Sequence, residues 1–99
     1  AANAAGERLI AGAAMQDVTI YTTRFCPFCV RAKQLLSHKQ VAFNEIPVDG
    51  RSDMRQDLLQ RTGQRTVPQI WVGDTHVGGC DELFALERAG KLDAMLADG

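Results

Sequence analysis

The segment from Val18 to His38 restricts the possible folds of this chain more than any other segment. Residues 18–22 are β-branched or aromatic, a composition typical of a short strand. After a turn, Cys26 and Pro27 begin a stretch whose apolar residues recur at helical spacing up to about His38. Proline suits the first position of a helix because the N–H that it lacks would have no partner there. The sequence therefore predicts a strand that leads through a turn directly into a helix.

The rest of the chain continues this alternation and completes an α/β domain. A strand–helix–strand unit places its two strands parallel with a right-handed crossover, whereas a hairpin at Gly73-Asp74 adds antiparallel strands. We therefore expect a four-stranded mixed sheet flanked by helices on both faces. The further elements that the sequence predicts are a strand over 41–48, a helix capped by Ser52 or Asp53 and ended by Gly63, a strand over 67–72, a short strand over 75–77, a helix opened by Asp81 and Glu82, and a helical stretch over 91–97.

The length of the chain fits one domain, which we expect to span residues 15–99. A chain of 99 residues supports one domain and not two. Residues 1–14 are rich in Ala and Gly, show no strand pattern, and lack the basic start and long apolar core of a signal peptide. We interpret Met15 as the natural start and the residues before it as a disordered or artificially attached extension.

Charge and hydropathy narrow the possible partners. The net charge is −1 and the basic residues are scattered, a pattern that does not favour a nucleic-acid-binding groove. No apolar run approaches the roughly 20 residues that a helix needs to span a bilayer. We therefore expect partners that are neither nucleic acid nor membrane.

The chain has three cysteines, Cys26, Cys29 and Cys80, which is an odd number with one close pair. Small secreted domains usually carry denser, even sets, so we expect a reducing compartment, the cytoplasm, in which the close pair is catalytic or binds metal. Two alternatives stay open at this point. One is a single structural disulfide in a secreted domain, and the other is a zinc site with His76 and Cys80 as its second pair of ligands.

The sequence Cys26-Pro27-Phe28-Cys29, between a strand and a helix, is typical of a redox motif. At the N-cap, Cys26 faces unpaired backbone N–H groups and the positive end of the helix dipole, and both stabilise a thiolate. Cys29 lies inside the first turn, where we expect it to be more buried and to remain a thiol. We therefore predict that Cys26 is the nucleophile and Cys29 the resolving cysteine, with no resident metal.

Two further segments are predicted to present backbone groups to a ligand. A cis Val67–Pro68 bond would turn the N–H and C=O of Val67 outward to pair with an extended substrate, whereas the alternative is an ordinary trans proline at a sheet edge. Gly78-Gly79 permits close approach of a ligand, and the helix beyond presents free N–H groups to a carboxylate. Asp81 either caps that helix, faces a ligand amine, or does both. We expect Cys80 to be a small buried residue without redox chemistry.

Together these three segments resemble the dithiol glutaredoxins, and the resemblance covers residues 16–99. The stretches IYTTRFCPFC, RTVPQIWV and HVGGCDEL are similar to the family's C-P-[YF]-C, TVP and GGC-[DS]-[DE] segments, most of all in short bacterial members. The resemblance implies a thioredoxin-like fold. It also implies an enzyme that reduces protein–glutathione mixed disulfides and protein disulfides, with glutathione as co-substrate. We expect this enzyme to be a monomer.

The resemblance further implies a glutathione-binding site. The Val67 backbone would pair with the cysteine of glutathione, the backbone at Cys80 and Asp81 with the Asp81 side chain would hold the γ-glutamyl end, and Gln60 would help to bind the glycine carboxylate. Phe28, which replaces the commoner tyrosine, would flank the cleft. The binding residues implied are Arg24, Phe28, Gln60, Thr66, Val67, Pro68, Gly79, Cys80 and Asp81.

Arg24 marks a departure from the family pattern. Many members place a lysine three residues before the first cysteine, where this chain has Thr23. Our hypothesis is that Arg24 takes over part of that lysine's role in binding a carboxylate of glutathione; the alternative is that Arg24 points to solvent.

Two other functions are possible for a chain of this kind. Related monothiol glutaredoxins with a C-G-F-S motif carry an iron–sulfur cluster between two subunits, but Pro27 and Cys29 disfavour this alternative here. A thioredoxin-like reductant that is reduced by an enzyme is disfavoured by the TVP and GGCDE segments.

Overall fold

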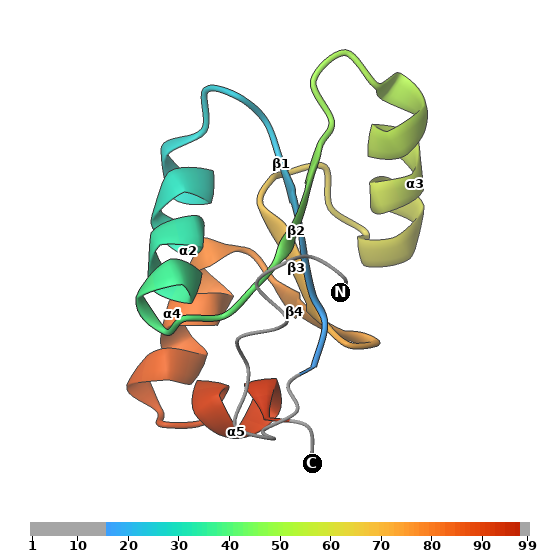
Figure 1. The fold of residues 1–99 in the computed structure, drawn as a ribbon. Helices are drawn as coiled ribbons and strands as arrows, with labels where there is room; N and C mark the ends of the chain where they lie inside the picture. The colour runs from blue at the N-terminus through green and yellow to red at the C-terminus, as the bar shows by residue number, and fades with distance from the viewer. Residues whose placement is uncertain (1–15, 98–99) are drawn as a thin grey trace.

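The computed structural model describes residues 16–97 (Figure 1). The expectations for residues 1–14 and for Met15 lie outside the described residues. The described elements are, in order, β1 (Val18–Thr22), α2 (Pro27–His38), β2 (Asn44–Pro47), α3 (Ser52–Thr62), β3 (Gln69–Val72), β4 (Thr75–Gly78), α4 (Cys80–Arg88) and α5 (Leu92–Leu96).

The strands form one mixed sheet in the order β2-β1-β3-β4. β1 and β2 are parallel, as the crossover through α2 requires, whereas β1–β3 and β3–β4 are antiparallel. The pairing of Tyr21 with Gln69 places the end of β1 beside the start of β3, and the pairing of Ile70 with Gly78 places the end of β4 there too. The segments that follow β1, precede β3 and follow β4 therefore meet at one end of the sheet.

Helices cover both faces of the sheet, and each face has its own apolar core (Figure 1). The larger core lies under α2, α4 and α5 and includes Val18 and Ile20 of β1. The smaller core lies under α3, where Leu58 packs with Trp71 and the partly buried Tyr21. This division follows from the strand pattern, since successive side chains of β1 point to opposite faces. The predicted four-stranded mixed sheet with helices on both faces is confirmed.

Some element boundaries differ from the predicted ones. β2 covers only Asn44–Pro47 and not 41–48, and these four residues pair with Thr19–Thr22 of β1. Val41 before it is buried in the larger core without joining the sheet. β3 begins at Gln69 and not at Val67, because the two residues before it form the cis peptide described below.

The caps of two helices also differ. The N-cap of α3 is Arg51, without a side-chain cap bond, so neither Ser52 nor Asp53 caps it. Gly63 ends α3 in the left-handed conformation, with φ 74°, as predicted. α4 begins at Cys80, one residue before the expected Asp81, and its N-cap is Gly79.

Candidate active site

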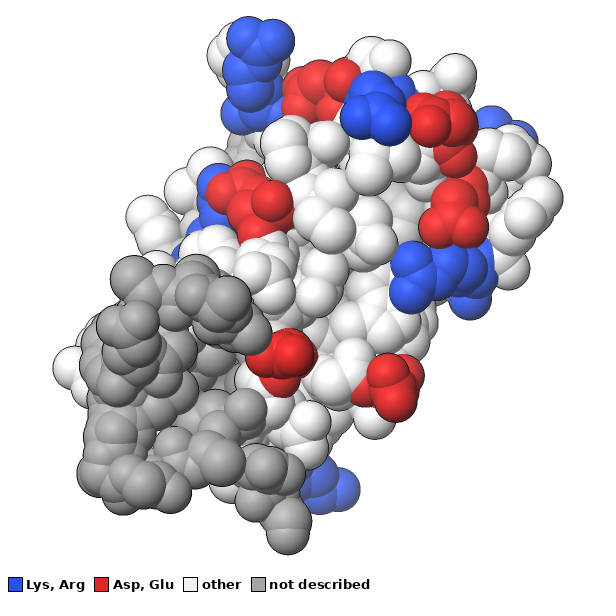
Figure 2. Space-filling view, turned by 45° about the vertical axis from the view of Figure 1, so that its right-hand side comes forward, with Lys and Arg blue, Asp and Glu red and all other residues white. Residues whose placement is uncertain are grey.

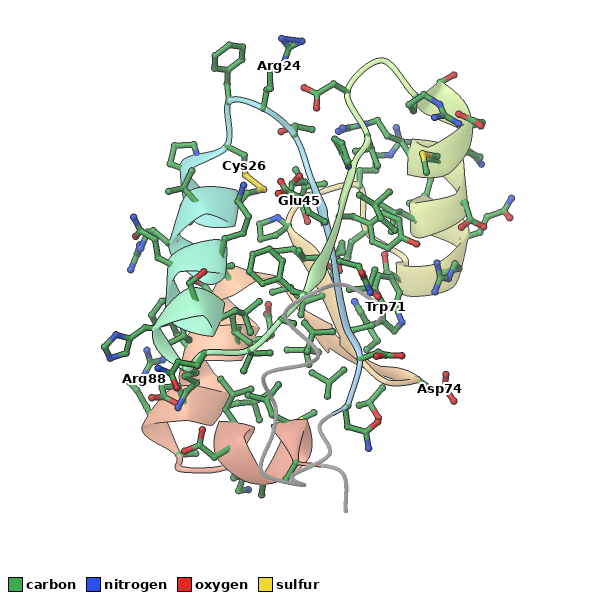
Figure 3. The ribbon with its side chains drawn as sticks, in the orientation of Figure 1. Arg24, Cys26, Glu45, Trp71, Asp74 and Arg88 are labelled. Atoms are coloured by element: carbon green, nitrogen blue, oxygen red, sulfur yellow. A yellow bond between two sulfur atoms is a disulfide. The ribbon has the colours of Figure 1, made fainter. Side chains whose placement is uncertain are left out.

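Cys26 is the N-cap of α2, directly after the turn that leaves β1, and forms a disulfide with Cys29 (Figure 3). Its backbone is extended, with φ −134° and ψ 98°, and the Cys29 N–H points at the Cys26 Sγ from 3.1 Å. A backbone N–H and the positive end of the helix dipole thus face this sulfur, and both stabilise the thiolate that reduction of the disulfide produces. The N-cap position predicted from the sequence is confirmed.

The two cysteines differ in exposure. Cys26 is 9% exposed, whereas Cys29 is 1% exposed. A sulfur that attacks a disulfide of another molecule has to be reached from solvent, but one that attacks the neighbouring Cys26 sulfur does not. The arrangement therefore suits an outer nucleophile and an inner partner.

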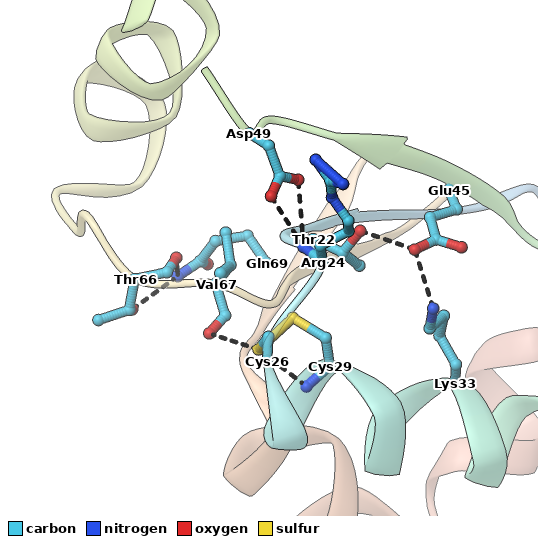
Figure 4. Close-up of a disulfide and its surroundings, with 10 residues drawn as sticks. All are labelled: Thr22, Arg24, Cys26, Cys29, Lys33, Glu45, Asp49, Thr66, Val67 and Gln69. Atoms are coloured by element: carbon cyan, nitrogen blue, oxygen red, sulfur yellow. Dashed lines mark hydrogen bonds and ion pairs between the residues drawn. A yellow bond between two sulfur atoms is a disulfide. The ribbon is translucent and has the colours of Figure 1, made fainter. Parts of the chain in front are cut away.

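A groove beside the disulfide brings together most of the predicted binding residues. The Val67 carbonyl oxygen lies 3.7 Å from the Cys26 Sγ, so one wall of this groove lies next to that sulfur (Figure 4). Its volume is about 280 Å³. The residues that line it are Phe28, Gln64, Thr66, Val67, Pro68, Gly79, Cys80, Asp81 and Glu82.

The Val67–Pro68 peptide bond is cis, as one reading of the sequence predicted, and the trans alternative is wrong. Gly79 approaches this segment from the start of α4. A Cβ atom at Gly79 would lie 3.2 Å from the Pro68 carbonyl oxygen, closer than most such contacts in proteins. Two segments form the walls of the groove, Val67-Pro68 and the start of α4. The lack of a side chain at position 79 allows these two walls to lie close together.

The first turn of α4 forms the second wall. The Gly79 N–H donates to the Glu82 carboxylate at 2.8 Å. This is one of the two hydrogen bonds of a capping box, in which the side chain at the third helical position accepts from the N-cap N–H. Asp81 therefore does not cap α4, because Gly79 and Glu82 do so. The exposed Asp81 side chain instead lines the groove within the first turn.

Cys80 lies in the same turn as a buried free thiol, 5% exposed. Burial raises the pKa of the Cys80 thiol, and the positive charge of Arg31 opposes this only in part. Since the thiolate is the reactive form, the raised pKa fits the prediction that Cys80 does no redox chemistry.

The structure does not bring Arg24 and Gln60 into the groove lining. The Arg24 backbone N–H donates to both Asp49 carboxylate oxygens, at 3.1 and 3.0 Å, and the guanidinium lies 5.9 Å from the Phe25 ring centre. Gln60 is exposed on α3, and the glutamine that does line the groove is Gln64, beyond the end of that helix. The turn before Cys26 thus directs Arg24 away from the groove.

A separate polar pocket, which Arg24 helps to line, contains a small charged network. The Glu45 carboxylate accepts from the Thr22 hydroxyl at 2.7 Å and from the Lys33 ammonium at 2.9 Å (Figure 4). Burial by itself would raise the pKa of Glu45, but these two hydrogen bonds outweigh it, so the pKa lies below its ordinary value. Glu45 is therefore ionised at neutral pH.

The part of the chain that the structure describes has neither a metal-binding cluster nor a membrane-spanning helix. Within 16–97, no three or more His, Cys, Asp or Glu side chains gather where they could hold a metal ion. None of the helices described is long and apolar enough to cross a bilayer. Acidic and basic side chains are interspersed on the face that Figure 2 shows.

The comparison with known sequences decides the family. The family model named Glutaredoxin matches residues 18–77. A glutaredoxin of Pseudomonas aeruginosa is 61% identical over 83 residues, which are 84% of this chain and 99% of that protein. The chain belongs to the glutaredoxin family. Glutaredoxin 3 of Escherichia coli is similar too, at 50% identity over 82 residues that cover 83% of this chain and 99% of the relative.

Solved glutaredoxin structures share the fold of this glutaredoxin. The solution structure of glutaredoxin from Brucella melitensis superposes with a TM-score of 0.76 at 51% identity, covering 83% of this chain and 89% of the other. The crystal structure of a buckwheat glutaredoxin–glutathione complex has a TM-score of 0.76 at 38% identity, with coverage of 80% and 74%. The thioredoxin-like fold expected from the resemblance is confirmed.

The activity of this glutaredoxin follows from its family and from its cysteine pair. It is a glutathione-dependent thiol–disulfide oxidoreductase with glutathione as co-substrate. The dithiol motif that the sequence resemblance singled out is present as the closed Cys26–Cys29 pair.

Sequence reasoning missed three polar residues of this site. Glu82 lines the groove, and its spacing three residues after Gly79 is a capping-box signal that could have found it. Gln69 lies behind the groove, and a polar residue within the apolar strand 67–72 was a usable signal. Gln64 gives no such signal, because only the path of the loop after α3 brings it to the groove.

Proposed function

We propose that this glutaredoxin reduces protein–glutathione mixed disulfides and protein disulfides in the cytoplasm, as a monomer, with Cys26 as nucleophile and Cys29 as resolving cysteine. The observation that carries the proposal is the Cys29 N–H directed at the Cys26 Sγ from 3.1 Å, at the N-terminus of α2. It supports a stabilised thiolate on the outer cysteine. The greater burial of Cys29 supports its role as the second attacker.

The reduction of a mixed disulfide needs Cys26 alone. The Cys26 thiolate attacks the glutathione sulfur of the mixed disulfide, a Cys26–glutathione disulfide forms, and the protein sulfur leaves as a thiolate that takes a proton from water. The thiolate of a second glutathione then attacks the glutathione sulfur bound to Cys26. Oxidised glutathione forms, and Cys26 leaves as the thiolate.

The reduction of a protein disulfide uses both cysteines. Cys26 attacks one substrate sulfur, which gives a mixed disulfide between enzyme and substrate and releases the other substrate sulfur as a thiolate. Cys29 loses its proton and attacks the Cys26 sulfur, so the Cys26–Cys29 disulfide closes and the substrate leaves fully reduced. The closed pair described above is the product of this step.

The groove beside Cys26 is the proposed binding site for glutathione. A buckwheat relative with the same fold was solved in complex with glutathione, which supports this ligand. Extended backbone at Val67 suits the cysteine of glutathione, and the N-terminus of α4 with Asp81 suits the γ-glutamyl end, which carries both a carboxylate and an amine. Gln60 remains a predicted contact of the glycine carboxylate, and Arg24 of a glutathione carboxylate, both from outside the groove lining.

The two cysteine variants test the division of labour. Cys26→Ser should lose both activities in a glutathione-coupled assay with a glutathionylated peptide and in an assay with a protein disulfide. Cys29→Ser should keep the first activity and lose the second, because only the second needs a resolving cysteine. Activity that survives in Cys26→Ser, or loss of both activities in Cys29→Ser, would contradict the assignment.

A further inference from the structure

Gln69 is a fully buried polar residue directly behind the groove. It opens β3, and its exposed fraction is 0%. A buried amide costs free energy unless its donors and acceptor are paired. Here the Nε2 donates to the Thr66 carbonyl oxygen and to the Gln64 Oε1, both at 3.0 Å, while the Oε1 lies 2.7 Å from the His76 Nε2.

The pairing fixes the orientation of the Gln69 amide. A carbonyl oxygen only accepts, so the atom that faces the Thr66 oxygen is the amide nitrogen, and the atom that faces His76 is the amide oxygen. The His76 Nε2 therefore carries a proton and donates it to Gln69. The His76 ring also packs against Trp71, with ring centres 4.7 Å apart. Gln69 is thus held at its far end by a side chain of β4.

This amide acts on the groove through one peptide unit. The Thr66 carbonyl and the Val67 N–H belong to the same peptide bond, which is trans, so the two groups point in opposite directions. The hydrogen bond from Gln69 holds the Thr66 oxygen on the side of Gln69, and this leaves the Val67 N–H on the opposite side of the peptide plane. Within residues 16–97 that N–H has no acceptor, and Val67 lines the groove.

We propose that Gln69, held in place by His76, is a positioning residue that directs the Val67 N–H toward the backbone of the bound glutathione moiety. This inference rests on the proposed function, because it assumes that the groove binds glutathione. Gln69 does not touch the ligand or the reacting sulfurs. Before the substrate binds, Gln69 already holds the Val67 N–H in the orientation in which this group donates to glutathione.

Gln69→Met removes the amide and keeps a long unbranched side chain of similar size. We expect the KM for a glutathionylated peptide to rise roughly five- to tenfold, the effect of one misplaced hydrogen bond. The kcat and the pH dependence of Cys26 alkylation by iodoacetamide should stay as in the wild type, since the N–H that stabilises the Cys26 thiolate comes from Cys29 in α2 and not from the Thr66–Val67 peptide. A structural role alone would not separate KM from these two measurements.

His76 provides a second pair of variants. His76→Phe keeps an aromatic ring against Trp71 but lacks the donor, so its KM should rise in the same direction by a smaller factor. His76→Gln can restore an N–H donor near the position of the histidine Nε2, and its KM should return toward the wild-type value. The two His76 variants also test the proposal if Gln69→Met does not fold.

Lys39→Met, at the distant junction of α2, α4 and α5, is the control for loss of stability. An unchanged KM in folded Gln69→Met, or an equal KM rise in the control, would overturn the proposal. Amide hydrogen exchange at Val67 gives a readout without substrate, and its rate should change in Gln69→Met. A wild type that does not turn over the peptide would refute the proposed function, whereas an unchanged Val67 exchange rate would refute the positioning role.

Discussion

At the residue scale, Gly79 shows how the absence of a side chain shapes the groove. Its φ of −99° is one that any residue can adopt, so the backbone conformation does not require glycine here. The lack of a side chain matters instead because a Cβ atom would lie 3.2 Å from the Pro68 carbonyl oxygen. Gly79→Ala should push the two walls apart. We expect the KM for a glutathionylated peptide to rise several-fold, with a loss of about 1 kcal/mol in the free energy of unfolding.

The matched control for this variant is Gly90→Ala. Gly90 has a φ of +73°, and apart from its chain neighbours no atom of residues 16–97 lies within 4 Å of the position that a methyl group would take there, so the cost is backbone strain of roughly 1–2 kcal/mol. Urea unfolding should therefore show a loss of stability in both variants, while only Gly79→Ala changes the KM. An unchanged KM in a folded Gly79→Ala protein would show that the walls tolerate the methyl group.

Arg24 is the residue at which sequence and structure give different indications. The family pattern suggests a base that binds a glutathione carboxylate, whereas the structure places Arg24 outside the groove lining. An exposed ion pair contributes at most about 1 kcal/mol, so Arg24→Ala should raise the KM for glutathione by no more than about fivefold. Arg88→Ala, at the C-terminal end of α4 (Figure 3), is the control. Identical KM values in the two variants would remove Arg24 from the site.

At the element scale, Lys39 joins the end of α2 to α4 and α5. Its ammonium lies 2.7 Å from the Asp93 carboxylate and 2.8 Å from that of Glu87, and its side chain is only 13% exposed. Hydrogen bonds to Asp93 and then Glu87 raise the pKa of Lys39 above its ordinary 10.5. The folded state therefore binds this proton more tightly than the unfolded chain does.

The sign of the pH dependence follows from this direction. Because the folded pKa is the higher one, the contribution of Lys39 to stability is complete below about pH 10.5 and is lost as the pH rises through the folded value. Lys39→Met should lower the free energy of unfolding by about 1 kcal/mol at pH 8. Urea unfolding at pH 8 and pH 11 measures the difference between the two proteins, which should shrink at the higher pH. A difference that stays constant would contradict this account.

Element boundaries were predictable only where a local cause sets them. Pro27 at the first position of α2 and Gly63 after α3 act through their own backbone preferences, and both mark the observed ends. The short β2 has no such cause in its own residues. Its four residues are those that the register of pairing sets beside Thr19–Thr22 of β1.

At the scale of the whole molecule, the site is a product of strand pairing. The Cys26-Cys29 segment lies far along the chain from the Val67-Pro68 segment and from the start of α4, yet the three meet at one end of the sheet. They meet because β1 and β3 are antiparallel and because β4 returns beside β3. The packing of α2 against α4 on the same face then closes the arrangement (Figure 1).

The sequence by itself determined what depends on local backbone chemistry and on motif spacing. This includes the strand-to-helix turn, Cys26 at the N-cap, the mixed sheet and the family. The tertiary structure alone decided which side chains face the groove, because that depends on the path of the chain between elements. It placed Gln64 in the groove lining and Gln60 outside it, placed Arg24 in a separate pocket, and paired Gln69 with His76 across two strands. No local preference of these residues encodes such contacts, since each needs a partner that is brought close only by folding.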